Sequence, residues 1–388
     1  MSAILLVQAC QKLEPSEPQE EDLLDGPMDD LSHAETQRFL DGDKTFNDEV
    51  FTIEKGLGPL FVANSCVSCH AGDGKGHPFS TLIRFGQTDE TGNKFLHLGG
   101  PQLQNRAIPG YTPETIPAGA TFSKLTPPAV TGLGLLEYVP DHLLLAMADP
   151  DDRDGDGIRG RVNWINIPSY VNPRAGGISQ NGKYIGRFGK KASVYDLLQQ
   201  TVDALSEDIG ITSIYNPIDV YSKEEIDPEI ETVKVNNLAF YLKTLKAPIP
   251  RHQDNPEVIK GKALFTQINC AACHRPTLKT GDAPIAALAN QEFHPYTDLL
   301  LHDMGPALDD GYTEGSAKTA EWRTPPLWGL GLSRKSQGGK YYLMHDGRAQ
   351  SIEQAIAMHG GEGSRARDAY NKQSDSDKTA LLKFLESL

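Results

Sequence analysis

The chain has 388 residues, with 37 Lys and Arg against 52 Asp and Glu and a formal net charge of −15. This length suggests roughly two to three domains, and the acidic balance without a basic run argues against nucleic acid or an anionic membrane surface as partners. It favours a cationic or neutral small partner, although solubility alone also accounts for it. No uninterrupted apolar run is long enough to span a membrane.

The first 30 residues resemble an export segment followed by a linker. An apolar stretch over 3–9 ends at Cys10, as at the lipidation site of a bacterial lipoprotein signal. The stretch is short and lacks a basic start, so we expect the full signal to begin upstream; a flexible tail with an ordinary thiol is the alternative. Residues 11–30 have linker composition. The prediction for 1–30 is a tether with a lipid anchor at Cys10.

The pattern Cys-x-x-Cys-His occurs at 66–70 and again at 270–274. In this motif two thiols form thioethers with one haem, and the adjacent histidine ligates its iron. A zinc site would need one further ligand after each set, and a redox dithiol would lie between a strand and a helix. The motifs therefore predict two covalently bound haem c groups, held by Cys66, Cys69, His70, Cys270, Cys273 and His274. Because such attachment occurs outside the bacterial cytoplasm, we expect the periplasm or the outer cell envelope as the location.

The remaining pattern predicts a mainly α fold: two cytochrome c-like haem modules with long loops and a helical connector. Helices are expected from His33, at apolar spacing over 194–205 and 230–245, over 256–265, and from Ser374 to the end. A helix before the haem motif and one at the end enclose the haem in a cytochrome c module. The predicted domains are an N-terminal haem domain at 31–165, the connector at 166–250 and a C-terminal haem domain at 251–388.

An internal repeat links the two halves. Thr-Pro-Pro followed by Gly-Leu-Gly-Leu occurs at 126–135 and again at 324–332. Each copy follows its own haem motif, so the halves are expected to be related modules. Aligned through the repeat, Ala148 of the first half falls opposite His359 of the second.

The sequence resembles the bacterial di-haem cytochrome c peroxidase and MauG-like superfamily, and within it the di-haem oxidoreductase family also labelled thiol oxidoreductase. The resemblance runs from about 56 to 388 and is carried by the haem motifs and by the phrases Gly132–Glu137, Asp149–Ile158, Gly186–Gly189, Pro295–Gly305, Glu321–Trp328 and His345–Ala349. One departure is Lys190, where the family usually has tryptophan after Gly-Arg-Phe-Gly; it puts an electron-relay role at that place in doubt. The thiol label has no support, because haem attachment leaves only Cys10.

The resemblance also implies the distal ligand of the second haem. In the related peroxidases it lies fourteen positions after the histidine of His-Asp-Gly, which from His345 is His359; Met358 is the alternative. Alanine cannot ligate iron, so Ala148 implies an open or loosely held site at the first haem, which His77 or His97 can fill in a resting state.

Three further side chains are expected near the haem edges without ligating iron. His345 is predicted to bond a propionate or order its loop. His302 and Met304 are candidate ligands, but structural hydrogen bonding is the more favoured role for them.

Peroxide cleavage needs a positioned acid-base group above the open iron. The resemblance implies Asp152, which follows Asp149-Pro150, or Glu137. Asp152, Asp154 and Asp156 before Gly157 also have the spacing of a calcium loop, although its twelfth position is Asn163 instead of glutamate. A Ca²⁺ site and a solvated acidic turn both remain open.

The leading prediction is an exported, peroxidase-like di-haem c-type oxidoreductase, in which an electron-transfer haem (His274/His359) feeds a reactive haem (His70). Its partners would be a small soluble electron donor of the cytochrome c or cupredoxin type and peroxide. The alternatives are a di-haem electron-transfer cytochrome and a MauG-like oxidase of a protein partner. The last would need a redox-active aromatic such as Trp164, Trp322 or Trp328, for each of which core packing is the more favoured role.

Overall fold

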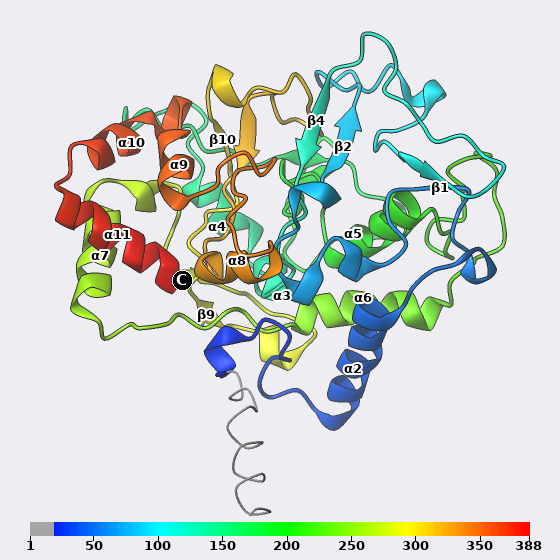
Figure 1. Ribbon diagram of the computed structural model, residues 1–388, viewed down its shortest axis with the longest axis horizontal. Helices are drawn as coiled ribbons and strands as arrows, with labels where there is room; N and C mark the ends of the chain where they lie inside the picture. Colours follow the sequence, from blue (N-terminus) through cyan, green and yellow to red (C-terminus); the bar gives the residue numbers. More distant parts are fainter. Residues whose placement is uncertain (1–18) are drawn as a thin grey trace, which may run out of the picture.

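The computed structural model describes residues 19–388, so the anchor predicted at Cys10 lies outside the described residues (Figure 1). Helices account for 35% of the structure and strands for 11%. Helix therefore exceeds strand, and irregular segments form the remainder. Across the described residues, no helix is long and apolar enough to cross a membrane.

The α-helices are mostly short, and the longest four carry the architecture. Their bounds are α2 (His33–Asp48), α3 (Leu133–Glu137), α4 (Asp141–Met147), α5 (Leu197–Asp203), α6 (Thr232–Thr244), α7 (Pro256–Gln267), α8 (Ser333–Ser336), α9 (Ile352–Ala357), α10 (Ser364–Asn371) and α11 (Asp375–Ser387). Two start signals match the predictions: Pro256 is the first residue of α7, and the Ser374 hydroxyl caps α11. The side chain of Asn255 also caps α7. A capping box between Ser32 and Glu35 begins α2.

The strands form small antiparallel sheets that brace the loops. They are β1 (Leu60–Phe61), β2 (Leu82–Phe85), β3 (Arg106–Ala107), β4 (Phe122–Leu125), β5 (Trp164–Ile165), β6 (Ser179–Gln180), β7 (Lys183–Ile185), β8 (Leu278–Lys279), β9 (Glu292–Phe293), β10 (Leu301–Asp303) and β11 (Glu321–Arg323). The pairs are β1–β3, β2–β4, β8–β9 and β10–β11, and β7 lies between β5 and β6.

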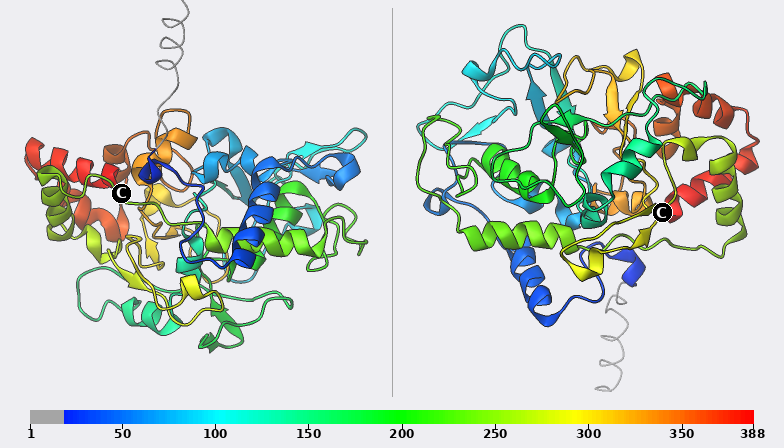
Figure 2. Two further views of the ribbon diagram at one scale, coloured as in Figure 1. Left: turned by 90° about the horizontal axis from the view of Figure 1, so that it is seen from below. Right: turned by 180° about the vertical axis from the view of Figure 1, so that it is seen from behind.

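Two crossed helix pairs stand at opposite ends of the molecule, α2 with α6 and α7 with α11 (Figures 1 and 2). Each crossing depends on a glycine. A Cβ at Gly42 of α2 would lie 2.2 Å from the carbonyl oxygen of Asn237 and 2.6 Å from the Tyr241 Cβ. A Cβ at Gly261 of α7 would lie 2.1 Å from the carbonyl oxygen of Ala380 and 2.7 Å from the Phe384 Cβ. The backbones therefore meet where no side chain intervenes, and in both pairs an aromatic residue covers the glycine.

The repeated Gly-Leu-Gly-Leu phrase has the same geometry in both halves. Its first glycine is left-handed in each copy, with φ of +70° at Gly132 and +67° at Gly329. Its second glycine packs against the end of the closing helix: a Cβ at Gly134 would lie 1.9 Å from the Lys243 carbonyl oxygen, and one at Gly331 would lie 1.9 Å from that of Glu386. The phrase thus meets the end of α6 in the first half of the chain and the end of α11 in the second, and these two halves are called the first and second modules below.

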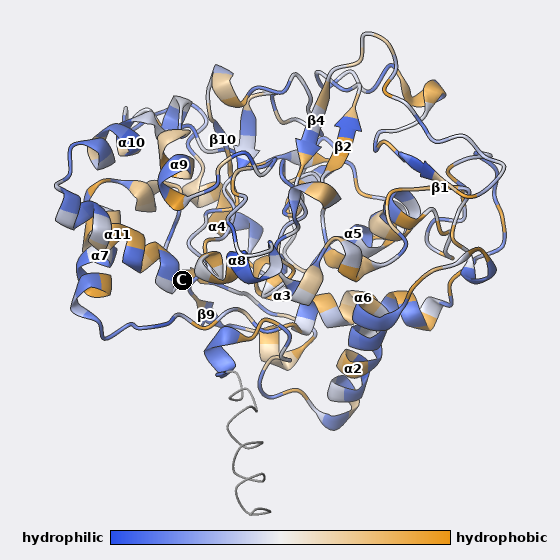
Figure 3. Cartoon of the chain, in the orientation of Figure 1, coloured by the Kyte–Doolittle hydropathy of each residue, from blue (hydrophilic) through white to orange (hydrophobic). Residues whose placement is uncertain are grey.

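The hydrophobic cores follow the helix pairs. The larger core runs from Phe39 of α2 through α5 and α6 to Trp328, and a smaller one joins α7 to α11 around Phe265 and Phe384. Hydrophobic and hydrophilic residues alternate along these helices, as an amphipathic packing face requires (Figure 3). The helices of the predicted connector, α5 and α6, therefore belong to the larger core, which also includes residues of the second half such as Leu288 and Trp328.

The end of the predicted tether is ordered against α6. The amide of Met28 donates to the Thr244 carbonyl at 2.8 Å, and the amide of Lys246 donates to the Gly26 carbonyl at 2.9 Å. The prediction that residues up to 30 only tether is wrong for this stretch, because backbone pairing holds it where composition alone indicated a linker.

Candidate functional site

Both Cys-x-x-Cys-His motifs adopt the same tight turn. Cys66–Ser68 and Cys270–Ala272 are 3₁₀ turns, and the amides of His70 and His274 each donate to the carbonyl of the first cysteine of their motif at 3.0 Å. The four cysteines of the motifs form no disulfide bonds. All of these thiols and both histidines line one continuous cavity. The turn therefore presents two thiols and an imidazole toward the same space.

The two motif histidines are fixed in the form that binds a metal. The Nδ1 atom of His70 lies 2.9 Å from the Pro128 carbonyl oxygen, and that of His274 lies 3.0 Å from the Tyr296 carbonyl oxygen. A carbonyl only accepts, so each Nδ1 carries the proton and each Nε2 keeps a free lone pair. Burial lowers the pKa of both imidazoles to about 4. Both rings are consequently neutral at pH 7, as an iron ligand must be.

His359 faces His274 across the cavity. It follows α9, and its Nδ1 lies 2.7 Å from the Ala355 carbonyl oxygen, which again leaves Nε2 free. The ring centroids of His274 and His359 are 6.5 Å apart. Two metal–nitrogen bonds of about 2.0 Å and roughly 1.2 Å from each nitrogen to its ring centre add to about 6.4 Å. The space between the rings thus suits one metal ion. Met358, the alternative ligand, packs in the smaller core and does not line the cavity.

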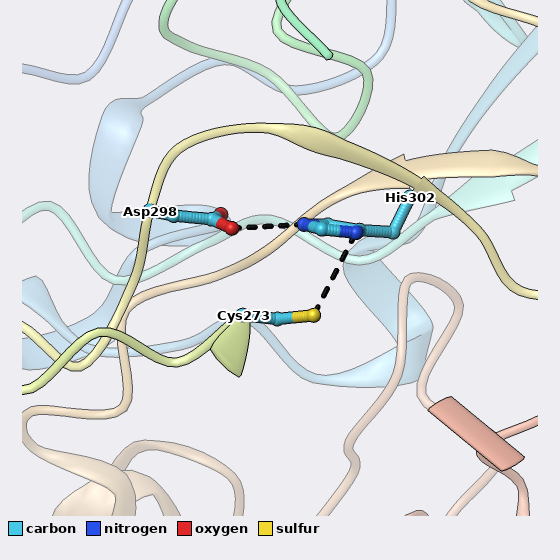
Figure 4. Close-up of side chains that lie close together, drawn as sticks. All are labelled: Cys273, Asp298 and His302. Atoms are coloured by element: carbon cyan, nitrogen blue, oxygen red, sulfur yellow. Dashed lines mark hydrogen bonds and ion pairs between the residues drawn. The ribbon is translucent and has the colours of Figure 1, made fainter. Parts of the chain in front are cut away.

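Both ring nitrogens of His302 have polar partners, and Figure 4 shows those to Asp298 and Cys273. Its Nε2 lies 2.9 Å from Asp298 Oδ2, and its Nδ1 lies 2.6 Å from Glu362 Oε2 and 3.6 Å from Cys273 Sγ. Burial opposes the charged ring, but the negative charge of Asp298 outweighs it and holds the pKa of His302 well above its usual value. Both ring nitrogens therefore donate, no lone pair is left for iron, and a structural role near the cavity wall fits His302.

His345 and Trp322 form a stacked pair on the cavity wall. Their ring centroids lie 3.7 Å apart at 7°, the His345 Nε2 lies 2.9 Å from Asp310 Oδ2, and the Trp322 indole donates to the Leu308 carbonyl. The Asp310 carboxylate also accepts from Ser123, so it ties the His345 loop to β4. This arrangement suits the loop-ordering role. Trp328 also lines the cavity, and Trp164 does not.

The two predicted acid-base residues lie off the cavity wall. Glu137 is 3% exposed, pairs with the Lys243 ammonium at 2.8 Å and accepts the Leu197 amide at 2.8 Å. Asp152 accepts the Gly157 amide within its own acidic turn. Glu137 thus joins α3 to α5 and α6. The repeat partner Ala148 and the candidates His77 and His97 do not line the cavity either.

Three acids that sequence reasoning missed line the cavity beside the first motif. They are Asp203 at the end of α5, and Glu207 and Asp208 on the π-helical turn Ala204–Ile209. Arg84 of β2 pairs with Glu207, and the Gln102 amide donates to Asp208. Burial, followed by the charge of Glu207, raises the pKa of Asp203 to about 8. Burial chiefly raises the pKa of Asp208 to about 7.

No sequence signal singled out these acids. Helical spacing places them on the polar side of an amphipathic helix, where a solvated face is the ordinary interpretation. The widened turn and the loops of β2 and Gln102 cover that side in the folded chain, so the buried position depends on distant segments.

The acidic turn brings together the predicted calcium residues. Carboxylate oxygens of Asp152, Asp154 and Asp156 lie within 4.8 Å of one another. Their amide contacts are internal to the turn: the Asp156 amide donates to Asp154, and the Ile158 amide donates to Asp156. This geometry suits a cation and a hydrogen-bonded acidic turn equally.

Comparison with known protein families shows the family to which the chain belongs. The family described as "Di-haem oxidoreductase, putative peroxidase" matches residues 122–388. The chain belongs to this family. As a di-haem oxidoreductase it is expected to carry two haem groups, and the two thiol pairs with their metal-ready histidines fit such groups. A search of curated protein sequences gave no match.

Solved structures similar to this di-haem oxidoreductase share little sequence with it. Hydrazine synthase from Kuenenia stuttgartiensis has 14% identity, with 97% of this chain and 95% of that chain covered and a TM-score of 0.40. The diheme peroxidase BthA from Burkholderia thailandensis has 16% identity, 91% and 86% coverage and a TM-score of 0.42. A MauG-like protein associated with microbial copper homeostasis has 14% identity, 67% and 89% coverage and a TM-score of 0.34. The family assignment rests on the sequence match.

Proposed function

We propose that this protein is a di-haem c-type oxidoreductase of the peroxidase type, with one electron-transfer site and one reactive site. The observation that carries the proposal is the inequivalence of the two sites. At the second motif two neutral imidazoles face each other 6.5 Å apart. At the first, Asp203, Glu207 and Asp208 line the same cavity as His70.

His274 and His359 would hold the iron of the second haem from both sides, and His70 would hold that of the first from one side. Each pair of thiols would anchor one haem through thioethers. When bound, the haems supply one-electron transfer, and an iron with an open axial position supplies peroxide chemistry. With both His274 and His359 holding its iron, the second haem would be suited to electron transfer.

The residues of the first site would handle the protons of peroxide reduction. A carboxylate with a pKa near neutrality can take a proton from one peroxide oxygen and return it to the other. Asp203 and Asp208 meet that requirement, because burial raises the pKa of both into the range of 7 to 8. Arg84, bound to Glu207 and Glu314, would hold the wall in place.

The proposal extends to cell location, partners and calcium. A periplasmic or outer-envelope location, with a lipid anchor at Cys10, agrees with haem c attachment. A small cytochrome c or cupredoxin would supply electrons, and a cationic docking face on it would complement the net charge of −15. A Ca²⁺ ion at Asp152, Asp154 and Asp156 would bridge three carboxylates that otherwise repel.

Electron paramagnetic resonance of the oxidised holoprotein tests the proposal. We expect one low-spin signal from the His274/His359 haem. The His70 haem should be high-spin at rest or become so after partial reduction. His359→Ala should convert the second haem to high spin and leave the first unchanged. Two low-spin signals that never yield a high-spin species would instead indicate a pure electron carrier. Oxidation of a protein partner with no turnover of small donors would indicate a MauG-like oxidase.

A further inference from the structure

Three basic side chains line the cavity that also holds the two motifs: Lys75, Lys190 and Arg323. Lys75 follows the first motif, Lys190 follows the Gly186–Gly189 phrase, and Arg323 ends β11. The Arg323 amide donates to the Lys190 carbonyl, and its Nε donates to the Gly189 carbonyl, each at 2.9 Å. The positive charges of Lys75 and Arg323 act on Lys190. This set is a local concentration of positive charge in an acidic chain.

The set has no carboxylate of its own. Within residues 19–388, none of the three side chains forms an ion pair, and neither lysine ammonium forms a hydrogen bond. The acids that act on them are engaged elsewhere: Asp346 accepts from Arg348 at 2.7 Å, and Asp298 binds His302. Three other cations of this wall are paired with acids: Arg84 with Glu207 and Glu314, His302 with Asp298 and Glu362, and Arg367 with Asp368. Arg365 of α10 instead donates to the Asp156 carbonyl.

Burial without a counter-charge is unfavourable for an ammonium group. Burial alone lowers the pKa of Lys75 to about 8, and burial followed by the Lys75 charge lowers that of Lys190 well below its usual value. Such a set is stable in its charged form only when an anion lies against it. The anions that a haem brings to this space are its two propionate carboxylates.

We propose that Lys75, Lys190 and Arg323 bind haem propionates in the space between the two motifs, and that the Lys190 ammonium raises the reduction potential of the His70 haem. Lys190 lines the same cavity as His70. A positive charge near iron favours the reduced haem, which carries one positive charge fewer. This inference rests on the proposed haem groups, but not on peroxidase activity.

Spectroelectrochemical titration of the holoprotein tests the inference. Lys190→Met keeps the length of the side chain and removes its charge, Lys190→Arg keeps the charge, and the exposed Lys44→Met on α2 is the control. At a fixed applied potential near the wild-type midpoint, we expect the reduced-to-oxidised ratio of the His70 haem to fall about tenfold or more in Lys190→Met. In Lys190→Arg and Lys44→Met it should stay within about twofold.

Pyridine haemochrome analysis of the same samples separates the two proposals. Fewer than two haems in the wild-type protein would overturn the haem assignment itself. Two haems with an unchanged titration in Lys190→Met would overturn only the role of Lys190. If Lys190→Met does not fold, Lys75→Met takes its place with the same expected direction, and an unchanged titration there counts equally against the inference. A wild-type potential that shifts on adding inorganic phosphate would indicate that the set binds a free anion, which also overturns it.

Discussion

The first and second modules share their framework and differ in what faces the iron site. Both use a glycine at the helix crossing, Gly42 and Gly261, and a left-handed glycine before the closing contact. The second module then places His359 opposite His274, whereas the first places buried acids beside His70. The comparison teaches that a common scaffold fixes the thiols and the proximal imidazole, and that the loops and the ends of helices decide the chemistry.

The largest expected effect is removal of one haem at a time. Replacing Cys66 and Cys69 together by serine should halve the haem content per chain and leave the low-spin signal of the second site. The same change at Cys270 and Cys273 should also halve it and should remove that signal. Haemochrome analysis with electron paramagnetic resonance checks both. Identical spectra from the two double variants would show that the sites are equivalent.

The acids of the first site should matter for turnover. Asp203→Asn or Asp208→Asn should lower the rate of reaction with peroxide by about 10² to 10⁴ through loss of acid-base catalysis. Stopped-flow mixing of the half-reduced protein with peroxide measures this rate. The exposed Asp48→Asn on α2 is the matched control. A rate within twofold of wild type in both acid variants would remove the acid-base role from this wall.

The glycine crossings should be sensitive in both modules. Gly42→Ala and Gly261→Ala each place a Cβ about 2 Å from a backbone carbonyl oxygen, and such overpacking costs about 1–3 kcal/mol or more. Urea unfolding of the holoprotein measures the free energy, with Gly26→Ala, where a Cβ meets nothing within 4 Å, as the control. Equal losses would confirm that the two crossings are equivalent, and a loss in one module alone would break the comparison.

The buried acids should also make the first module sensitive to pH. Their raised pKa values mean that the folded state holds protons that the unfolded state releases near pH 4. Stability should therefore fall as pH rises from about 4 to 8, by up to about 1.4 kcal/mol per pH unit for each group. Asp208→Asn should flatten this slope in urea unfolding between pH 5 and 8. A slope unchanged by the substitution would contradict the burial argument.

Calcium should have the smallest effect. If the acidic turn binds Ca²⁺, adding the ion should stabilise the folded state by about RT ln(1 + [L]/Kd), where [L] is the free Ca²⁺ concentration. The melting temperature should then rise by about a few degrees. Asp154→Asn should abolish the response. A rise that persists in this variant would place the ion elsewhere.

The sequence predicted the local features of both modules and missed what depends on distant packing. The haem motifs, the starts of α7 and α11 and the repeated glycines are short-range patterns, and they appear in the structure where expected. The backbone pairing of residues 26–28 with the end of α6 depends on segments far along the chain, and so does the position of Asp203 and Asp208 on the cavity wall. The periodicity that predicted α5 gave no sign of the π-helical turn after it, because a wider turn keeps the same apolar residues on the buried side.

The two helix pairs also differ in the sequence separation between their partner helices. The hydrogen bond from Asn47 to Tyr241 joins α2 to α6 across 194 residues, whereas the contact of Lys383 with Glu257 joins α11 to α7 across 126 residues. The entropic cost of the longer closure is greater by only a few tenths of a kcal/mol, so the two pairings differ little in equilibrium terms. Synthesis runs from the N-terminus, so α6 emerges before α7 exists. The first helix pair can therefore form before the second. Arg323 is synthesised after Lys75 and Lys190, so it can join the cavity wall only later.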